Sequence, residues 1–172
     1  MSAAKRITPA PPATAPEAQV LEDRIRAARG EINALYAVLL NSPAVAHGWE
    51  QMLTAIRQQT GIAPHLRELV ILRIAVINRV EYEFTSHVPY AKAAGVSDEK
   101  LAAVRSGDLS VFDEMERLVL DYAETMTRQV QVPDALFARV AAVFDQKGRV
   151  ELTATAAAYN MVSRFLAALE IA

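Results

Sequence analysis

The chain has 172 residues, 52% of them hydrophobic, and a formal net charge of -2 at neutral pH. This length and apolar content predict one globular domain with a substantial core. The 18 basic residues are interspersed with 20 acidic ones, so we expect no nucleic-acid or anionic-membrane partner, which would need a concentrated positive surface. Cysteine is absent, which excludes disulfides, thiolate metal sites and cysteine nucleophiles.

The sequence shows no segment that predicts a membrane span or a secretory signal. The longest apolar runs are interrupted by Arg73, Arg79 or Arg164, whereas a spanning helix needs an unbroken apolar stretch. Lys5 and Arg6 near the N-terminus are not followed by an apolar segment. We therefore expect a cytoplasmic protein.

Residues 1–17 are rich in proline and alanine and predict an extended arm, which is either disordered or lies across a neighbouring subunit. From residue 18 to 172, apolar positions recur at helical spacing and no convincing strand pattern occurs, so we expect a single all-α domain. Caps and breakers divide it into about eight helices, at residues 18–40, 43–59, 64–77, 79 or 80 to 94, 97–107, 110–126, one beginning at 133, and 149–168.

The helix expected at residues 64–77 is apolar on nearly every side, which predicts a central helix surrounded by others. Glu68 within it lies either near the helix end in water or inside the protein with a partner. Asn78 and Glu81 form a capping-box-like pattern that begins the next helix. Glu81 and Glu83 then lie in its first turn, where the helix dipole stabilises carboxylates.

Glu83 and His87 are four residues apart and therefore share a face of that helix. A carboxylate beside an imidazole can fix its tautomer and raise its pKa, which suits acid–base chemistry near neutral pH. The same spacing is common on solvated helix faces, where such a pair contributes little. Tyr82 and Ser86 form a second pair with this spacing.

Several segments together resemble the carboxymuconolactone decarboxylase and alkylhydroperoxidase D-like family, over about residues 41–169. They are Leu66–Arg73, Glu81-Tyr82-Glu83, His87-Val88-Pro89, Ala94–Ser97 and Tyr159-Asn160-Met161-Val162. The resemblance implies an all-helical alkylhydroperoxidase D-like domain built around a central helical hairpin. It also implies a homo-oligomer, either a trimer or a hexamer.

The resemblance distinguishes two branches of that family by their chemistry. The peroxidase branch carries a Cys-x-x-Cys pair, with a glutamate twelve residues before the first cysteine and a histidine seven residues after it. Those spacings select Glu68 and His87 here, but the cysteine positions hold Val80 and Glu83. Thiol peroxidase chemistry is therefore excluded, because its attacking group is a thiolate.

The decarboxylase branch has Glu-His-Glu-x-x-x-His at the same place, and this chain has Glu81-Tyr82-Glu83 followed by His87. Tyrosine at the middle position is a hydrogen-bond donor and not a neutral-pH base, which leaves the substrate open. The resemblance implies an enzyme that transfers protons on a small carbonyl, lactone or carboxylated substrate, in aromatic catabolism, with no metal or organic cofactor.

Within that hypothesis each polar residue has an expected role. His87 is the general acid or base, and Glu83 or Glu68 orients it. Tyr82 donates a hydrogen bond to the substrate or to the developing anion, and Glu81 contacts the substrate.

Two other interpretations stay open at the level of sequence. A family member could bind a ligand or a partner as an oligomer and have lost turnover. Alternatively, Glu83, His87 and His65 could hold zinc or iron, which would give a metal-dependent lyase, isomerase or hydrolase on the same fold. A pocket in which Glu68, Tyr82 and His87 converge would favour the enzyme.

Overall fold

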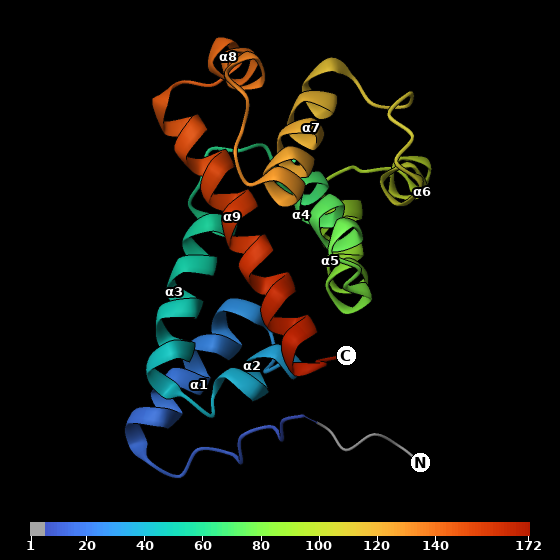
Figure 1. Ribbon diagram of the computed structural model, residues 1–172. Helices are drawn as coiled ribbons and strands as arrows, with labels where there is room; N and C mark the ends of the chain where they lie inside the picture. The colour runs from blue at the N-terminus through green and yellow to red at the C-terminus, as the bar shows by residue number, and fades with distance from the viewer. Residues whose placement is uncertain (1–5) are drawn as a thin grey trace. The chain divides into compact units, whose positions relative to one another are not determined.

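The computed structural model describes residues 6–172, and in that part of the chain it contains α-helices and no β-strand (Figure 1), which confirms the all-α prediction. Residues 1–5 of the predicted arm lie outside the described residues. The helices are α1 (Pro16–Arg29), α2 (Ala34–Leu39), α3 (Pro43–Gln58), α4 (Pro64–Ile77), α5 (Glu81–Ala93), α6 (Asp98–Ser106), α7 (Glu114–Gln129), α8 (Asp134–Val143) and α9 (Gln146–Leu169).

The helices fall into two compact units. One unit comprises Met1–Gln59 together with Leu166–Ala172, and the other comprises Thr60–Phe165. The second unit contains α4 to α8 and most of α9. That residues 18–172 form a single domain stays a prediction.

The described part of the N-terminal arm, residues 6–15, is extended and hydrogen-bonded within its own unit. The amide of Ala10 donates to the carbonyl of Ala37 at 2.8 Å, and the side chain of Asn41 donates to the carbonyl of Thr8 at 2.9 Å. These bonds attach the arm to α2 and the residues that follow it. The helix after the arm begins at Pro16, because proline is well suited to a first helical position.

Three predicted helices have different bounds. The helix expected at residues 149–168 begins at Gln146, so Gly148 lies inside it and does not separate it from the preceding helix. The helix expected at residues 18–40 is divided into α1 and α2, because Gly30 adopts φ 85° and ends α1. The helix expected to begin at Ser110 begins instead at Glu114. There Asp113 and Glu116 form a reciprocal capping box that satisfies two backbone donors, which Ser110 does not provide.

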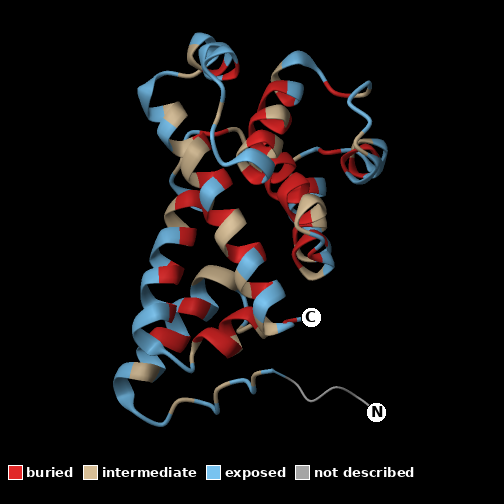
Figure 2. Ribbon diagram, viewed as in Figure 1, coloured by how far each residue is buried: buried red, intermediate tan, exposed pale blue. Residues whose placement is uncertain are grey.

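Helix α4 matches its predicted range and lies at the centre of the second unit, packed against α5, α6 and α7. Figure 2 shows most of the helix as buried. The buried residues are Leu66, Glu68, Leu69, Val70, Ile71, Leu72, Arg73, Ile74 and Ala75. The prediction of a central helix with apolar residues on every side is therefore confirmed.

The turn between α4 and α5 differs from the predicted capping box. Asn78 ends α4 and does not cap α5. Its side chain donates instead to Asn160 of α9, at 3.2 Å. The next residue, Arg79, adopts φ 58°, a left-handed conformation that non-glycine residues rarely adopt. The chain therefore reverses at Arg79, and α5 begins at Glu81 without a side-chain cap.

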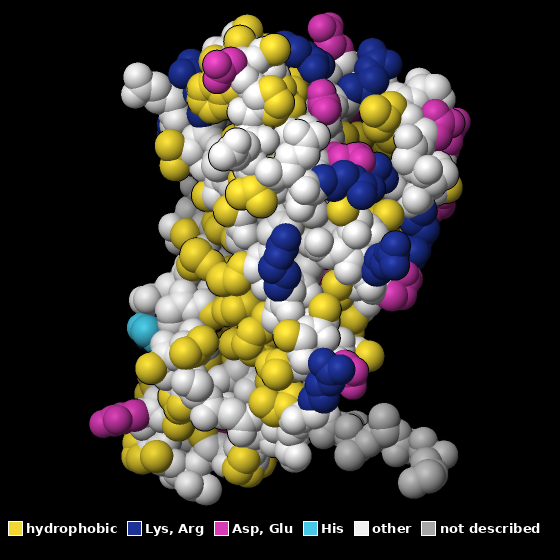
Figure 3. All heavy atoms as spheres, viewed as in Figure 1, with side chains coloured by type: hydrophobic (Ala, Val, Ile, Leu, Met, Phe, Trp, Pro, Cys, Tyr) yellow, Lys and Arg dark blue, Asp and Glu magenta, His cyan; other side chains and the backbone are white. Residues whose placement is uncertain are grey.

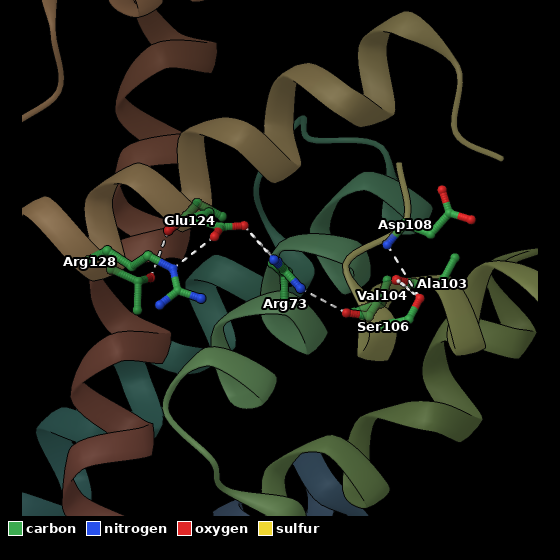
Figure 4. Close-up of polar contacts among 9 residues, drawn as sticks. Arg73, Ala103, Val104, Ser106, Asp108, Glu124 and Arg128 are labelled. Atoms are coloured by element: carbon green, nitrogen blue, oxygen red, sulfur yellow. Dashed lines mark hydrogen bonds and ion pairs between the residues drawn. The ribbon is translucent and has the colours of Figure 1, made fainter. Parts of the chain in front are cut away.

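Arg73 fixes α4 against two neighbouring helices (Figure 4). Its guanidinium donates to Glu124 of α7, with Nε 3.0 Å from the carboxylate, and to the carbonyl of Val104 in α6 at 2.9 Å. Arg128 donates to the same Glu124 carboxylate at 2.8 Å. Arg73 is buried, and its charge is neutralised by this pairing. The network holds α6 and α7 in place around α4.

The surface carries charges of both signs. On the face shown in Figure 3, lysine and arginine side chains lie among aspartates and glutamates and do not gather in one basic patch. Among the described helices, none combines the length and the hydropathy that crossing a bilayer requires.

Candidate functional site

Helices α4 and α5 form the predicted central hairpin, joined by residues 78–80. The all-apolar sequence of α4 makes it the inner helix, and Glu68 is its one buried acidic residue. The other helix, α5, carries Glu83 and His87 on one face, because residues four apart lie one above the other. The hairpin therefore brings a carboxylate of α4 to a carboxylate and an imidazole of α5.

His87 contacts a carboxylate through each of its two ring nitrogens, with a hydrogen bond to Glu68 and an ion pair with Glu83. Nδ1 lies 2.7 Å from Oε2 of Glu68, and Nε2 lies 3.3 Å from Oε1 of Glu83. All three residues are buried, with exposed fractions of 1% for Glu68, 4% for Glu83 and 6% for His87. Glu68 is thus held inside with a partner, which was one of the two predicted alternatives.

Two tyrosine rings pack against the imidazole. Tyr159 of α9 meets it edge-on, with ring centroids 5.2 Å apart, and is itself buried. Tyr90, one turn further along α5, lies at 5.7 Å and is exposed. The imidazole thus contacts one buried and one exposed tyrosine ring.

The pKa of His87 is raised above its usual value by its two carboxylate partners. Burial is the largest single influence and lowers the pKa. The hydrogen bonds to Glu68 and Glu83 and the charges of both carboxylates raise it, and together they outweigh burial. The imidazole is therefore held in its protonated form to a higher pH than a free histidine.

Arg67 adds a second cation to the cluster. Its Nε lies 3.4 Å from Oε1 of Glu68, the oxygen that does not bond His87. Two carboxylates, one imidazolium and one guanidinium sum to zero charge. Buried ions are tolerated only when paired in this way, so Arg67 balances the charge of the buried cluster.

The other two predicted site residues lie elsewhere on α5. Tyr82 is half-buried and is roughly 140° around the helix axis from His87, at 100° per residue. Glu81 is exposed and is bound by both terminal nitrogens of Arg105, at 2.6 and 2.9 Å. The structure therefore brings together Glu68, Glu83 and His87, and it places Glu81 in a different ion pair.

Sequence reasoning did not assign a role to Arg67, Tyr90 or Tyr159. Arg67 and Tyr159 belong to the segments that carried the family resemblance, which was a signal available in the sequence. Tyr90 has no such signal beyond its distance of three residues from His87. The described residues contain no group of three or more histidine, aspartate and glutamate side chains arranged to hold a metal ion.

Residues 43–124 match the model of the carboxymuconolactone decarboxylase family. This region of the chain belongs to that family. The matched region includes Glu68, Glu83 and His87, and the recognition made from the sequence is confirmed. The uncharacterized protein YnjA of Escherichia coli K12 is 36% identical over 118 residues, which make up 67% of this chain and 64% of YnjA. The alignment thus spans slightly less than two thirds of that relative.

Solved structures show the same fold at low sequence identity. An alkylhydroperoxidase AhpD core protein from Ralstonia eutropha JMP134 has a TM-score of 0.83 at 16% identity, with 97% of this chain and 90% of that chain covered. The debrominase Bmp8 has a TM-score of 0.79 at 17% identity, with 96% and 90% covered. The alkylhydroperoxidase D-like fold predicted from the sequence is therefore confirmed.

Within the carboxymuconolactone decarboxylase family, this chain differs from the thiol-bearing branch at the residue that faces His87. The spacing of that branch places its second cysteine at position 83. Here Glu83 fills the position, with its carboxylate 3.3 Å from the imidazole. A carboxylate cannot enter a disulfide cycle, but it can hold and exchange a proton with the imidazole.

Proposed function

We propose that this protein is a thiol-free enzyme of the decarboxylase-like branch, which transfers protons through His87 on a small carbonyl, lactone or carboxylated substrate. One observation supports the proposal above the others. His87 is buried, with a carboxylate in contact with each ring nitrogen, Glu68 by a hydrogen bond and Glu83 by an ion pair. A solvated surface pair would lack both the burial and the second carboxylate, so the alternative of an inconsequential Glu83/His87 pair is disfavoured.

The reaction that this cluster suits is loss of a carboxylate from the carbon atom next to a carbonyl group, as in a β-keto acid. The C–C bond to the carboxylate breaks, carbon dioxide leaves, and the electron pair moves onto the carbonyl to give an enolate. A proton must then be delivered to the carbon. Protonated His87 is a suitable donor, because its two carboxylate partners raise its pKa and favour the imidazolium. Solvent then restores the proton to His87.

The two carboxylates are proposed to have different roles. Glu68 makes the shorter contact, 2.7 Å to Nδ1, and is fixed on the buried central helix. It is therefore the positioning residue, which fixes the tautomer and ring orientation. The contact of Glu83 with Nε2 is longer, at 3.3 Å. Nε2 is thus the nitrogen that a substrate would approach.

Tyr82 and Glu81 remain candidates for substrate contacts. Because Tyr82 lies roughly 140° around α5 from His87, we propose that it donates a hydrogen bond to a part of the substrate away from Nε2. Glu81 would have to leave Arg105 to contact a substrate, because both of its oxygens are bound there.

We also propose a cytoplasmic homo-oligomer, a trimer or a hexamer, acting in aromatic catabolism without a cofactor. Large apolar side chains are exposed on several helices, as an oligomer interface requires. They include Val20, Val45, Met52, Phe137 and Val150. Light scattering at micromolar concentration should give a multiple of three protomers, and a monomer would refute this part of the proposal.

Turnover by a His87→Ala variant tests the proposed function. A panel of carboxylated lactones and β-keto acids should first identify a substrate, with carbon dioxide release as the assay. His87→Ala should then lose about 10²- to 10⁴-fold in rate with the fold and assembly unchanged. The matched control is His65→Ala, a half-buried histidine outside the cluster, which should keep the rate of the unsubstituted protein.

Two further variants separate the roles of the neighbouring residues. Glu83→Gln should lower the pKa of His87 and move the pH optimum toward acid, because an anionic neighbour favours the protonated imidazole. Tyr82→Phe should reduce kcat without that shift, since it removes a donor and not a charge. Near-normal turnover by His87→Ala would show that the cluster is structural, and no turnover of any panel member would favour a ligand-binding protein.

A further inference from the structure

A cavity of about 230 Å³ lies beside the start of α5, and His87 is not among the residues that line it. Its apolar wall contains Ala75 and Val80 and the ring of Phe84, all three buried. Three charged side chains also line the cavity: Arg79, Glu81 and Arg105. The cavity thus combines an apolar wall with two cations and one anion.

Arg105 is held in a fixed orientation at this cavity. Its guanidinium carbon lies 3.7 Å from the centre of the Phe84 ring, a stacked cation–π contact. Its two terminal nitrogens bind the two oxygens of Glu81, at 2.9 and 2.6 Å. This is the two-point geometry that arginine forms with carboxylates. The protein's own Glu81 therefore shows which kind of anion Arg105 is oriented to accept.

Arg79 supplies a second cation that is not engaged in this way. Within residues 6–172 its side chain makes no hydrogen bond and no ion pair. Its backbone is held at φ 58° in the turn between α4 and α5, a conformation that glycine or asparagine would adopt at lower cost. An arginine here is therefore not explained by the requirements of the turn.

We propose that this cavity binds a small organic carboxylate, with Arg79 and Arg105 on the anion and the wall of Ala75, Val80 and Phe84 against its apolar body. Glu81 occupies Arg105 in the free protein and competes with the ligand. The two arginines and Glu81 sum to one positive charge, which a bound monocarboxylate neutralises. A single water needs only about 10–15 Å³ of such space, so the cavity holds a ligand of several heavy atoms.

This proposal does not depend on proton transfer by His87, and a binding measurement tests it without any substrate. Benzoate is titrated into the full-length protein by isothermal calorimetry, with benzamide as the uncharged molecule of the same shape. Benzoate should bind saturably, and benzamide should bind at least about tenfold more weakly, because only the carboxylate forms charge-assisted bonds with arginine. A titration with inorganic phosphate distinguishes a site that binds any anion from a site that also requires the apolar part of the ligand.

Three substitutions assign the binding to this cavity. Arg79→Gln and Arg105→Gln should each weaken benzoate binding about tenfold. Glu81→Gln should strengthen it, because the internal competitor for Arg105 is removed. Arg105→Lys is a second variant at that position, in case loss of the stacked guanidinium disturbs the fold. It keeps the charge but loses the two-point geometry, so its affinity should also fall.

The chain offers a matched control pair. Arg139 and Asp121 form another exposed arginine–carboxylate pair, at 3.0 Å. Arg139→Gln and Asp121→Asn should leave benzoate affinity unchanged. Equal binding of benzamide and benzoate, or an affinity insensitive to both Arg79→Gln and Arg105→Gln, would overturn the proposal. Phosphate binding as strong as that of benzoate would also overturn it, because the apolar wall would then contribute nothing.

Discussion

Glu81 and Glu83 are two residues apart in the first turn of α5, yet they lie in opposite environments. Glu83 is buried against His87, whereas Glu81 is exposed and bound to Arg105. Helical positions two apart differ by about 200° around the axis, so one carboxylate points toward α4 and the other toward the surface. The dipole of the helix favours both carboxylates equally. The comparison shows that burial and the identity of the partner, and not position in the turn, distinguish the two carboxylates.

The largest expected difference between the two environments is in stability. Glu68→Ala removes one of two carboxylates from the buried cluster and leaves His87 and Arg67 with incomplete pairing, which should cost about 3–5 kcal/mol. Glu81→Ala removes one partner of an exposed pair and should cost less than about 1 kcal/mol. Urea unfolding followed by circular dichroism measures both. Equal losses would show that the cluster of His87 is no more tightly coupled than the surface pair.

The pH dependence of stability should also distinguish the two environments. The pKa of His87 is raised in the folded protein above the usual 6.5. Its contribution to the free energy of unfolding is therefore complete below about pH 6.5 and is lost as the pH rises through the folded pKa. The slope is at most about 1.4 kcal/mol per pH unit.

Urea unfolding between pH 6 and pH 9 checks this dependence, with His87→Gln as the control. The variant should lack the loss of stability at alkaline pH. His47 and His65 are present in both proteins, so any contribution from them cancels in the comparison. The contribution of the exposed Glu81 to stability has the opposite pH dependence, because Arg105 lowers the pKa of Glu81. Its small contribution is present above the usual pKa of a glutamate and is lost as the pH falls through the lowered value. An identical alkaline slope in the variant would mean that His87 is not the group that titrates.

Salt should affect the two pairs unequally. A double-mutant cycle on Glu81 and Arg105 should give a coupling energy of about 0.2–1 kcal/mol at low salt. In 1 M sodium chloride most of this coupling energy should be lost, because the screening length is then about 3 Å. The coupling between Glu68 and His87 should persist, because buried pairs are screened far less. A salt-insensitive coupling at Glu81 would show that stacking of Arg105 on Phe84, and not charge, holds that pair.

The sequence predicts those features of the fold and the site that depend on local residue pattern. The range of α4 followed from its apolar composition and from Pro64, and the Glu83/His87 pair followed from helical spacing. The partner of Glu68 is nineteen residues away along the chain, so its place beside His87 depended on the family spacing and not on local pattern. The role of Arg105 was not predictable, because Glu81 and Arg105 meet only when α5 and α6 pack together, and nothing local in either segment indicates that contact.

Arg79 lies in the turn that precedes both carboxylates, and its replacement gives the smallest expected change in stability. Asparagine tolerates the left-handed conformation observed at φ 58° better than arginine does. The exposed Arg79 side chain makes no hydrogen bond or ion pair within the described residues that would be lost. Arg79→Asn should therefore leave stability unchanged or raise it by about 0.5 kcal/mol, which for a chain of this size is a rise in Tm of about 1–2 °C. The same variant should lose benzoate affinity if Arg79 serves as an anion-binding residue, so differential scanning calorimetry and the benzoate titration should move in opposite directions. A fall in Tm of several degrees would instead show that Arg79 stabilises the turn, and an arginine there would need no ligand to explain it.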